Sequence, residues 1–312
     1  MSKLKAPFYP LVHHFNHIFF TLFFGANRFR YRLEPLEDLS GERVLILAPH
    51  VDDDVIGCGG LLARLPRICR AVKCVYLTDG SRSIHPYFTP EQLAELRRGE
   101  GEQVAEFYGL EPPSFLNVPD GQLSADEETC TRLAREVKDF EPTAVFLPSL
   151  LDGHRDHTTT SPLLLRALDR VGLSENFPLH LYQVNSPLTF YTANRCFPLT
   201  RREKEAKKRA MEIFASQTLP FEGFLTLDRC RRAALPRSLR QREVEAAEFF
   251  RRTTKEEHEM ILNSITAGVY RNFRQLSRPY TLVRDFFSGW GVKKEAGRIL
   301  KGRESRAEDI IE

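Results

Sequence analysis

The chain has 312 residues, of which 42% are hydrophobic and 28% are charged, so it can bury a substantial core. This composition excludes a fibrous, collagen-like or wholly disordered protein, and no apolar run reaches the roughly 18 residues that a membrane-spanning helix needs. The net charge is +3, with a basic stretch from residue 201 onward and an acidic remainder. Six cysteines without a C-x-x-C pair argue against a disulfide scaffold and a thiolate zinc site, and they favour reduced thiols in a cytoplasm.

The first 32 residues form an aromatic, basic segment without any Asp or Glu, and we assign residues 1–40 to a separate N-terminal segment. Three interpretations stay open at this point. The segment can be a helix packed on the core of the following domain. It can lie in a membrane interface, which would give residues 1–32 a peripheral membrane contact. Its apolar centre can also belong to a signal peptide, although no small-x-small cleavage site follows cleanly.

Between residues 43 and 184, short apolar runs alternate with stretches of helical periodicity. Pro90 lies near the start of one helical stretch and Gly109 just past its end, and Ser124-x-x-Glu127 has the spacing of a capping box. Alternation of this kind predicts an α/β fold with a Rossmann-like, mostly parallel sheet flanked by helices. Strands are expected at 43–48, 73–78, 115–118, 143–147 and 180–184, and helices at 55–65, at 90–108 and from 124.

Strand signals stop after about residue 200, where the pattern predicts helices at 201–217, 241–253 and 256–267. We therefore expect a catalytic domain over residues 41–225. A basic helical C-terminal extension over residues 226–312 would pack on this domain or flank it.

Two polar clusters follow directly after expected strands. One begins Pro49-His50-Val51-Asp52-Asp53-Asp54 and the other spans residues 152–157. This edge of an open α/β sheet is where ligands bind. Carboxylates crowded so closely raise each other's pKa unless a cation joins them. Imidazole with carboxylate suits Zn2+ or another borderline divalent metal, and two histidines with one acid would leave a coordination position for water.

The first cluster and the glycines after it also have two other interpretations. The three successive Asp residues can cap the helix expected from Val55. Gly57-x-Gly59-Gly60 can suggest a phosphate-binding loop, but it lies inside the helical pattern instead of at a turn. Because both clusters fall at strand ends of one expected sheet, we favour the functional interpretation.

The clusters resemble the motifs of the PIG-L/LmbE-like family of zinc-dependent N-acetylglucosaminyl deacetylases. The family motif P-H-P-D-D-E-x-x-G-x-G-G is similar to residues 49–60, and H-x-D-H is similar to residues 154–157. Val51 and Asp54 depart from the first motif without removing a ligand position. Weaker similarities extend the resemblance over about 43–220, including an R-x-x-E helix, a P-D-G turn and a late S-Q pair.

The resemblance implies a hydrolase that removes the N-acetyl group of an N-acetylated amino sugar or glycoconjugate, and it implies no nucleic-acid partner. The metal would be Zn2+, or another divalent transition metal, held by His50, Asp53 and His157. Asp52 would be the general base, and His154 would stabilise the oxyanion or act as a general acid. The further residues that it implies are Asp156 and Asp54 in support of the ligands, and Arg97 and Asp120 at sugar hydroxyls.

Two other functions remain open at this stage. A nucleotide-sugar-dependent glycosyltransferase could use Asp52 and Asp54 to hold a divalent metal, although His50 and His157 would then have no role. A non-catalytic, membrane-associated relative could retain the fold alone. The expected location is the cytoplasm, with membrane association through residues 1–32 as the alternative, and the sequence leaves the oligomeric state open.

Overall fold

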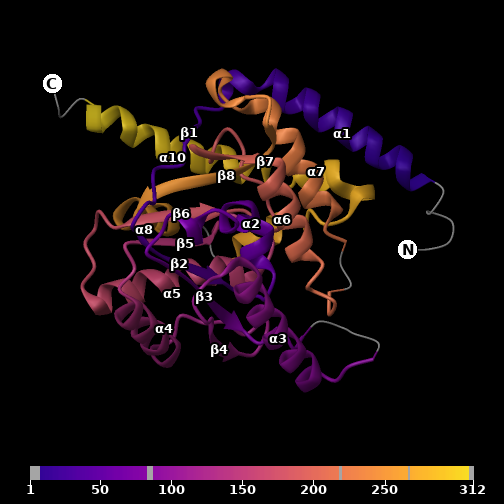
Figure 1. Cartoon of the computed structure of the whole chain (residues 1–312). Coiled ribbons are helices and arrows are strands. Elements are labelled where there is room, and N and C mark those ends of the chain that lie inside the picture. The colour runs from indigo at the N-terminus through magenta and orange to yellow at the C-terminus, as the bar shows by residue number, and fades with distance from the viewer. Residues whose placement is uncertain (1–7, 83–86, 218–219, 266–267, 309–312) are drawn as a thin grey trace.

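The computed structural model describes residues 8–82, 87–217, 220–265 and 268–308 (Figure 1). Its centre is an eight-stranded sheet in the order β1-β7-β8-β6-β5-β2-β3-β4. Neighbouring strands are parallel, except that β8 runs antiparallel to both β6 and β7. The expected α/β fold with a mostly parallel sheet flanked by helices is therefore confirmed.

The strands are β1 Glu34–Pro35, β2 Arg43–Ala48, β3 Ala71–Thr78, β4 Ser114–Val118, β5 Ala144–Pro148, β6 Pro178–Tyr182, β7 Arg195–Thr200 and β8 Val244–Thr254. The helices are α1 Tyr9–Ala26, α2 Asp53–Leu62, α3 Pro90–Tyr108, α4 Glu127–Phe140, α5 Arg155–Val171, α6 Arg201–Met211, α7 Glu222–Arg231, α8 Lys255–Asn263, α9 Leu282–Phe286 and α10 Trp290–Glu308.

The sheet separates two apolar cores, because side chains of a strand alternate between its faces. In β2, Val44 and Ile46 face a core shared with α2, α3, α6 and α7. Leu45 and Leu47 face the opposite core, beneath α4 and α5. Burial on both faces explains why the central strands are continuous apolar runs in the sequence.

The expected helix over residues 241–253 is wrong, because Val244–Thr254 forms β8 between β6 and β7. Its Ala, Glu and Arg residues favour a helix locally, and pairing with two neighbouring strands overrides that preference. A strand of the predicted C-terminal extension thus lies inside the sheet of the predicted catalytic domain. Strand β7 was not expected either, since Pro198 argues against a central strand.

Two expected helices differ at their ends. The helix expected from Ser124 begins at Glu127, because the side chain of Asp126 accepts a hydrogen bond from the backbone N–H of Thr129 and caps α4. The helix expected over 201–217 ends at Met211, and the following residues form turns that lead to the polar edge of the sheet.

Helix α1 lies across the top of the molecule in Figure 1, next to α7. Phe20 and Phe24 are fully buried and pack against Phe286 of α9. The side-chain amide of Asn16 donates a hydrogen bond of 2.7 Å to the carbonyl oxygen of Pro279. One face of α1 therefore belongs to the core. No helix in the described part of the chain is long and apolar enough to cross a membrane.

Candidate active site

The two polar clusters meet at the carboxyl ends of β2 and β5, which are paired neighbours in the sheet. Residues 49–52 connect β2 to α2, and residues 149–154 connect β5 to α5. Because α2 begins at Asp53 and α5 begins at Arg155, the first turns of both helices contribute to the same region. The structure brings the two clusters together as the sequence predicts.

Three donor atoms converge at this edge. Nδ1 of His50 lies 3.1 Å from Nε2 of His157, and Oδ2 of Asp53 lies 3.2 Å from the former atom and 3.1 Å from the latter. Tetrahedral zinc with ligands at about 2.0–2.1 Å separates its ligand atoms by about 3.3 Å. The three side chains are therefore spaced as a divalent metal requires. Two overlapping sets also fit a metal: His50 with His154 and His157, and His50 with Asp120, His154 and Asp156.

Asp152 supports His157 from the side away from the cluster, with Oδ1 2.8 Å from Nδ1 of the ring. The Asp152 carboxylate is itself held by the backbone N–H groups of His154, Asn185 and Ser186 at 3.0, 2.8 and 3.1 Å. A metal-ligating imidazole commonly has such a carboxylate on its other nitrogen. We did not predict this residue, although it opens the second polar cluster.

Asp120 and Asp156 both lie beside the far nitrogen of His50. Nε2 of His50 is 3.2 Å from Oδ1 of Asp120 and 3.5 Å from Oδ2 of Asp156. Asp156 also accepts a hydrogen bond of 2.7 Å from the backbone N–H of Gly121. Asp120, which we expected to contact sugar hydroxyls, lines the pocket and also contacts His50, a candidate metal ligand.

The electrostatics of the cluster favour positive charge at both histidines. Burial alone would lower the pKa of His50, but hydrogen bonds to Asp120, Asp156 and Asp53 outweigh it and raise the pKa well above its ordinary value. For His157 burial again opposes the positive charge, while Asp53 and Asp152 raise the pKa to about 10. Neighbouring carboxylates thus demand positive charge at this place, which a divalent cation can also supply.

Asp52 is placed differently from its neighbour Asp53. Its backbone has a φ of 152°, rare for a residue with a side chain, and its side chain makes no capping hydrogen bond to α2. Oδ2 of Asp52 instead accepts a hydrogen bond of 2.6 Å from the side-chain amide of Gln217. Burial and then the charge of Asp53 raise the pKa of Asp52 to about 8. The capping interpretation therefore fails for this residue.

Gln217 is a site residue whose role the sequence did not reveal. Glu100 of α3 fixes the preceding residue, since its carboxylate accepts hydrogen bonds from the backbone N–H and hydroxyl of Ser216 at 2.7 and 2.6 Å. Arg97, one helical turn before Glu100, is buried and lines the pocket. The only available signal was the weak similarity of the R-x-x-E and S-Q segments to family motifs.

His154 is held in its neutral form. Burial, followed by the charges of His50 and His157, lowers the pKa of His154 to about 4. Its Nδ1 accepts a hydrogen bond of 3.2 Å from the backbone N–H of Asp156, so the ring proton is placed on Nε2. The ring stands perpendicular to that of His50, at 4.6 Å between centroids. A neutral imidazole with this tautomer is a hydrogen-bond donor at the pocket.

Asp54 lies outside the pocket. It is fully buried, and its Oδ2 accepts a hydrogen bond of 2.9 Å from the hydroxyl of Tyr76 on β3. Burial raises the pKa of Asp54 to about 6. Its position ties the start of α2 to the sheet and leaves Asp52 and Asp53 as the carboxylates of this cluster that face the pocket.

The pocket over the cluster has a volume of about 160 Å³. Its lining residues are His50, Asp52, Asp53, Ile56, Arg97, Asp120, His154, His157, Val184, Asn185, Gln217 and Gln275.

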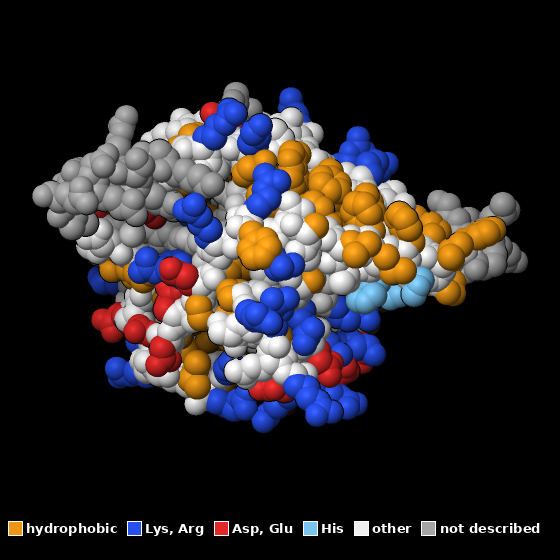
Figure 2. Space-filling view, turned by 90° about the horizontal axis from the view of Figure 1, so that it is seen from above, with side chains coloured by type: hydrophobic (Ala, Val, Ile, Leu, Met, Phe, Trp, Pro, Cys, Tyr) orange, Lys and Arg blue, Asp and Glu red, His pale blue; other side chains and the backbone are white. Residues whose placement is uncertain are grey.

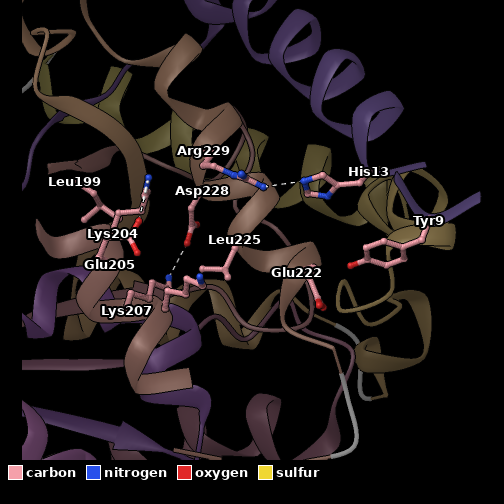
Figure 3. A pocket seen from close by; sticks show the side chains of 11 residues that line it. Tyr9, His13, Leu199, Lys204, Glu205, Lys207, Glu222, Leu225, Asp228 and Arg229 are labelled. Atoms are coloured by element: carbon pink, nitrogen blue, oxygen red, sulfur yellow. Dashed lines mark hydrogen bonds and ion pairs between the residues drawn. The ribbon is translucent and has the colours of Figure 1, made fainter. Parts of the chain in front are cut away.

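A larger pocket of about 420 Å³ lies between α1, α6 and α7 (Figure 3). It shares no lining residue with the first. Its buried Lys207 is already paired with Asp228 at 2.7 Å and with Glu248 at 2.8 Å. Arg229 points toward His13 of α1, with 3.1 Å between Nη2 and Nε2. The charge of Lys207 is thus matched by two carboxylates within the protein.

The region around the cluster is similar to proteins of a known family. The model of the family described as GlcNAc-PI de-N-acetylase (PIG-L) matches residues 45–168. The diacetylchitobiose deacetylase of Thermococcus kodakarensis is 29% identical over 144 residues, which are 45% of this chain and 53% of that protein. The chain spans about half the length of the curated relatives that it matches. The family match confirms the resemblance that the two motifs predict.

Solved structures agree with this fold. The N,N'-diacetylchitobiose deacetylase from Pyrococcus horikoshii superposes with a TM-score of 0.51 at 22% identity, over 68% of this chain and 84% of that chain. GalB, the 4-carboxy-2-hydroxymuconate hydratase of Pseudomonas putida, superposes with a TM-score of 0.54 at 19% identity, over 67% and 95%. At these identities the likeness shows the fold alone, and the second protein shows that the fold also serves other reactions.

Proposed function

We propose that this protein is a metal-dependent hydrolase that removes the N-acetyl group from an N-acetylated amino sugar or glycoconjugate, because the PIG-L family model matches residues 45–168. The products are acetate and a free amine. The observation that carries the proposal is the convergence of donor atoms from His50, Asp53 and His157 within 3.2 Å of one another. A base and a hydrogen-bond donor, Asp52 and His154, line the same pocket.

The donor set suits Zn2+ or another divalent transition metal, because two imidazole nitrogens and one carboxylate are ligands that such ions prefer. We assign the metal to His50, Asp53 and His157, with Asp152 holding the second of these histidines from behind. Bound there, the metal would lower the pKa of a water molecule and polarise the acetamide carbonyl.

Asp52 is the group that we assign to proton transfer. It accepts a proton from the attacking water while the new C–O bond forms at the acetamide carbon. Gln217 donates to Oδ2 and so fixes the direction of the carboxylate. When the C–N bond breaks, the same proton passes to the leaving nitrogen, which releases acetate and the free amine.

His154 is the group that we assign to the oxyanion. With its Nδ1 occupied by the backbone N–H of Asp156, the Nε2–H of the neutral ring can donate to the negative oxygen that forms during attack. Donors fixed before the reaction stabilise such a charge strongly. Arg97 and Asp120, which also line the pocket, are assigned to sugar hydroxyls.

The glycosyltransferase alternative receives no support. It needs Asp52 and Asp54 to share one metal, but Asp54 is hydrogen-bonded to Tyr76 and does not line the pocket. The non-catalytic alternative does not explain why His50, Asp53, His154 and His157 converge on one pocket.

The experiment that tests the proposal combines metal analysis with acetate release. We expect about one divalent metal ion per purified chain, acetate release from a panel of N-acetylglucosamine conjugates, loss of release on chelation and recovery on adding Zn2+. His157→Ala should lose both metal and activity, whereas His14→Ala, at an exposed histidine of α1, should keep both. Folded protein without stoichiometric metal would contradict the ligand assignment.

A further inference from the structure

Helix α1 is apolar on two opposite faces. One face carries Phe20 and Phe24, which are fully buried in the core. The other carries a row of side chains at spacings of three and four residues, which places them on one side of a helix. These outward residues, which we call the apolar row, are Phe8 (59% exposed), Leu11 (68%), Phe15 (58%), Ile18 (46%) and Leu22 (66%).

The row forms a continuous apolar strip in the space-filling view from above (Figure 2). An ordinary surface helix is polar on the face opposite to its buried stripe. Contiguous apolar surface of this kind marks an interaction site. With 18 residues at about 1.5 Å per residue, α1 is about 27 Å long, so the row offers an extended line of contact.

The charged side chains of α1 and of the residues directly after it are of one sign. The sequence has no Asp or Glu before Glu34, while Arg28 and Arg32 follow the row and are exposed. In Figure 2, Lys and Arg side chains lie on both sides of the strip, and the acidic side chains gather mainly toward the lower part of the view. A second copy of this chain would bring like charges together at this face, whereas an anionic surface would match them.

We infer that the apolar row of α1 docks this protein on the surface of an anionic lipid bilayer. The row enters the interface while its other face keeps α1 attached to the domain, and Arg28 and Arg32 meet lipid phosphates. The helix lies in the plane of the surface and does not span it, in agreement with the absence of a membrane-crossing helix in the described chain.

The docking face is connected to the catalytic pocket. Gln275 lines the pocket, and the short segment that follows it reaches α1, where Pro279 accepts the hydrogen bond of Asn16 and the ring of Tyr280 contacts that of Tyr9. The segment thus runs from the pocket to the buried side of α1, beneath the docking face. The inference itself does not depend on the proposed reaction, because membrane binding is measured without turnover.

The test is sedimentation of the full chain with vesicles of phosphatidylcholine, with and without phosphatidylglycerol. We expect binding to the vesicles that contain phosphatidylglycerol and weaker binding as salt is raised. The double variant Leu11→Gln/Leu22→Gln should bind the vesicles at least about tenfold more weakly than the parent, because it removes apolar contact with the lipid. Glutamine keeps the helix propensity of the two positions. The matched control is Ile68→Gln, at an exposed isoleucine away from α1, which should bind like the parent.

Two results would overturn the inference. One is that the parent protein does not sediment with anionic vesicles, or that the double variant sediments equally well. The other is that sedimentation velocity without lipid shows a dimer that the double variant converts to a monomer while vesicles bind neither form. In that case a second copy, and not a bilayer, covers the row. Acetate release from a water-soluble conjugate should be the same in all three proteins, which shows that the pocket is intact.

Discussion

Asp52 carries both a strained backbone and the proposed base. Its φ of 152° lies where a side chain is unfavourable, and such conformations cost about 1–3 kcal/mol and concentrate at functional sites. The neighbouring Asp53, with an identical side chain, begins α2 and contributes a candidate metal ligand. The backbone conformation therefore separates two adjacent carboxylates into two roles.

The strain at Asp52 can be measured with two variants that both remove the carboxylate. We expect Asp52→Gly to be more stable than Asp52→Ala by about 1 kcal/mol, because only glycine adopts this φ readily. Both should retain metal and lose acetate release. Urea unfolding gives the difference in free energy of unfolding, and equal stability of the two variants would show that the backbone is not strained.

Asp152 offers a prediction about metal affinity. Asp152→Asn should weaken metal binding by about 10- to 100-fold, because Nδ1 of His157 loses the carboxylate beside it. Competition with a chromophoric chelator measures the affinity. Asp126→Asn, which replaces the cap of α4 with an equally good one, is the control and should bind metal like the parent. Unchanged affinity in Asp152→Asn would remove Asp152 from the site.

Sequence patterns sufficed for the residues that lie close together along the chain. His50, Asp53, His154 and His157 fall in two short motifs, so their types and spacing already indicate a metal. Gln217 could not be found in this way, because its contact with Asp52 joins positions 165 residues apart and exists only when α3 and the turns after α6 are in place. The roles of all these residues stay predictions until the variants are measured.

At the scale of elements, β8 anchors the helix that carries Asp53. The carboxylate of Glu248 accepts hydrogen bonds from the backbone N–H groups of Gly60 and Leu61 in α2 at 2.8 and 2.9 Å. Lys207 of α6 donates to the same carboxylate, to Asp228 of α7 and to the carbonyl oxygen of Ile56. The buried Lys207 and its two acidic partners thus connect α6 with α2, α7 and β8.

Removing this lysine should cost more than removing the charge of one acid. We expect Lys207→Met to lower the free energy of unfolding by about 3–5 kcal/mol, because the buried carboxylate of Glu248 loses its cation and that of Asp228 is left with Arg231 alone. Glu248→Gln should cost about 1–2 kcal/mol, because Lys207 keeps Asp228 as its partner. Urea unfolding gives both values. If Glu248→Gln costs more than Lys207→Met, then the hydrogen bonds from the backbone of α2 to Glu248 contribute more than the ion pairs of Lys207.

Helix α8 contains a buried histidine that should make stability depend on pH. His258 is fully buried, neither ring nitrogen has a hydrogen-bond partner among the described residues, and burial lowers its pKa to about 4 from 6.5. Between these two pH values the unfolded chain binds a proton that the folded chain does not. Stability should therefore fall by about 3 kcal/mol from pH 6.5 to pH 4 on account of this residue.

The variant His258→Met should remove that part of the pH dependence. Unfolding curves at several pH values would show a smaller loss of stability in the variant than in the parent, whereas parallel curves would assign the pH dependence to other groups. His180, which is also buried with a pKa of about 4, remains in both proteins and serves as an internal reference.

Local sequence also explains which elements were predictable. The apolar runs of β2, β3 and β5 are buried on both faces, so composition alone identifies them. The segment of β8 has the composition of a helix, and only its pairing with Pro178–Tyr182 and Arg195–Thr200, both distant in sequence, makes it a strand. No local pattern records such a pairing.

At the scale of the whole molecule, the C-terminal part of the chain completes the sheet. A chain ending at residue 225 would lack β8, so β6 and β7 would each have one unpaired edge where β8 lies between them. Lys207 would also lose both of its acidic partners, Asp228 and Glu248. We expect this truncation to show no cooperative unfolding transition by circular dichroism. A cooperatively folded 1–225 fragment would show that the predicted catalytic domain folds without the C-terminal part of the chain.

The position of β8 has a consequence for synthesis of the protein. His50 and His157 are translated early, but the sheet that positions them is complete only after residue 254, the end of β8, has been made. At about 5–20 residues per second, the roughly 100 intervening residues take about 5–20 s. During that interval the ribosome-bound chain exposes two unpaired strand edges and an unanchored α2. This protein should therefore need chaperone protection during translation more than a protein whose sheet is assembled in chain order.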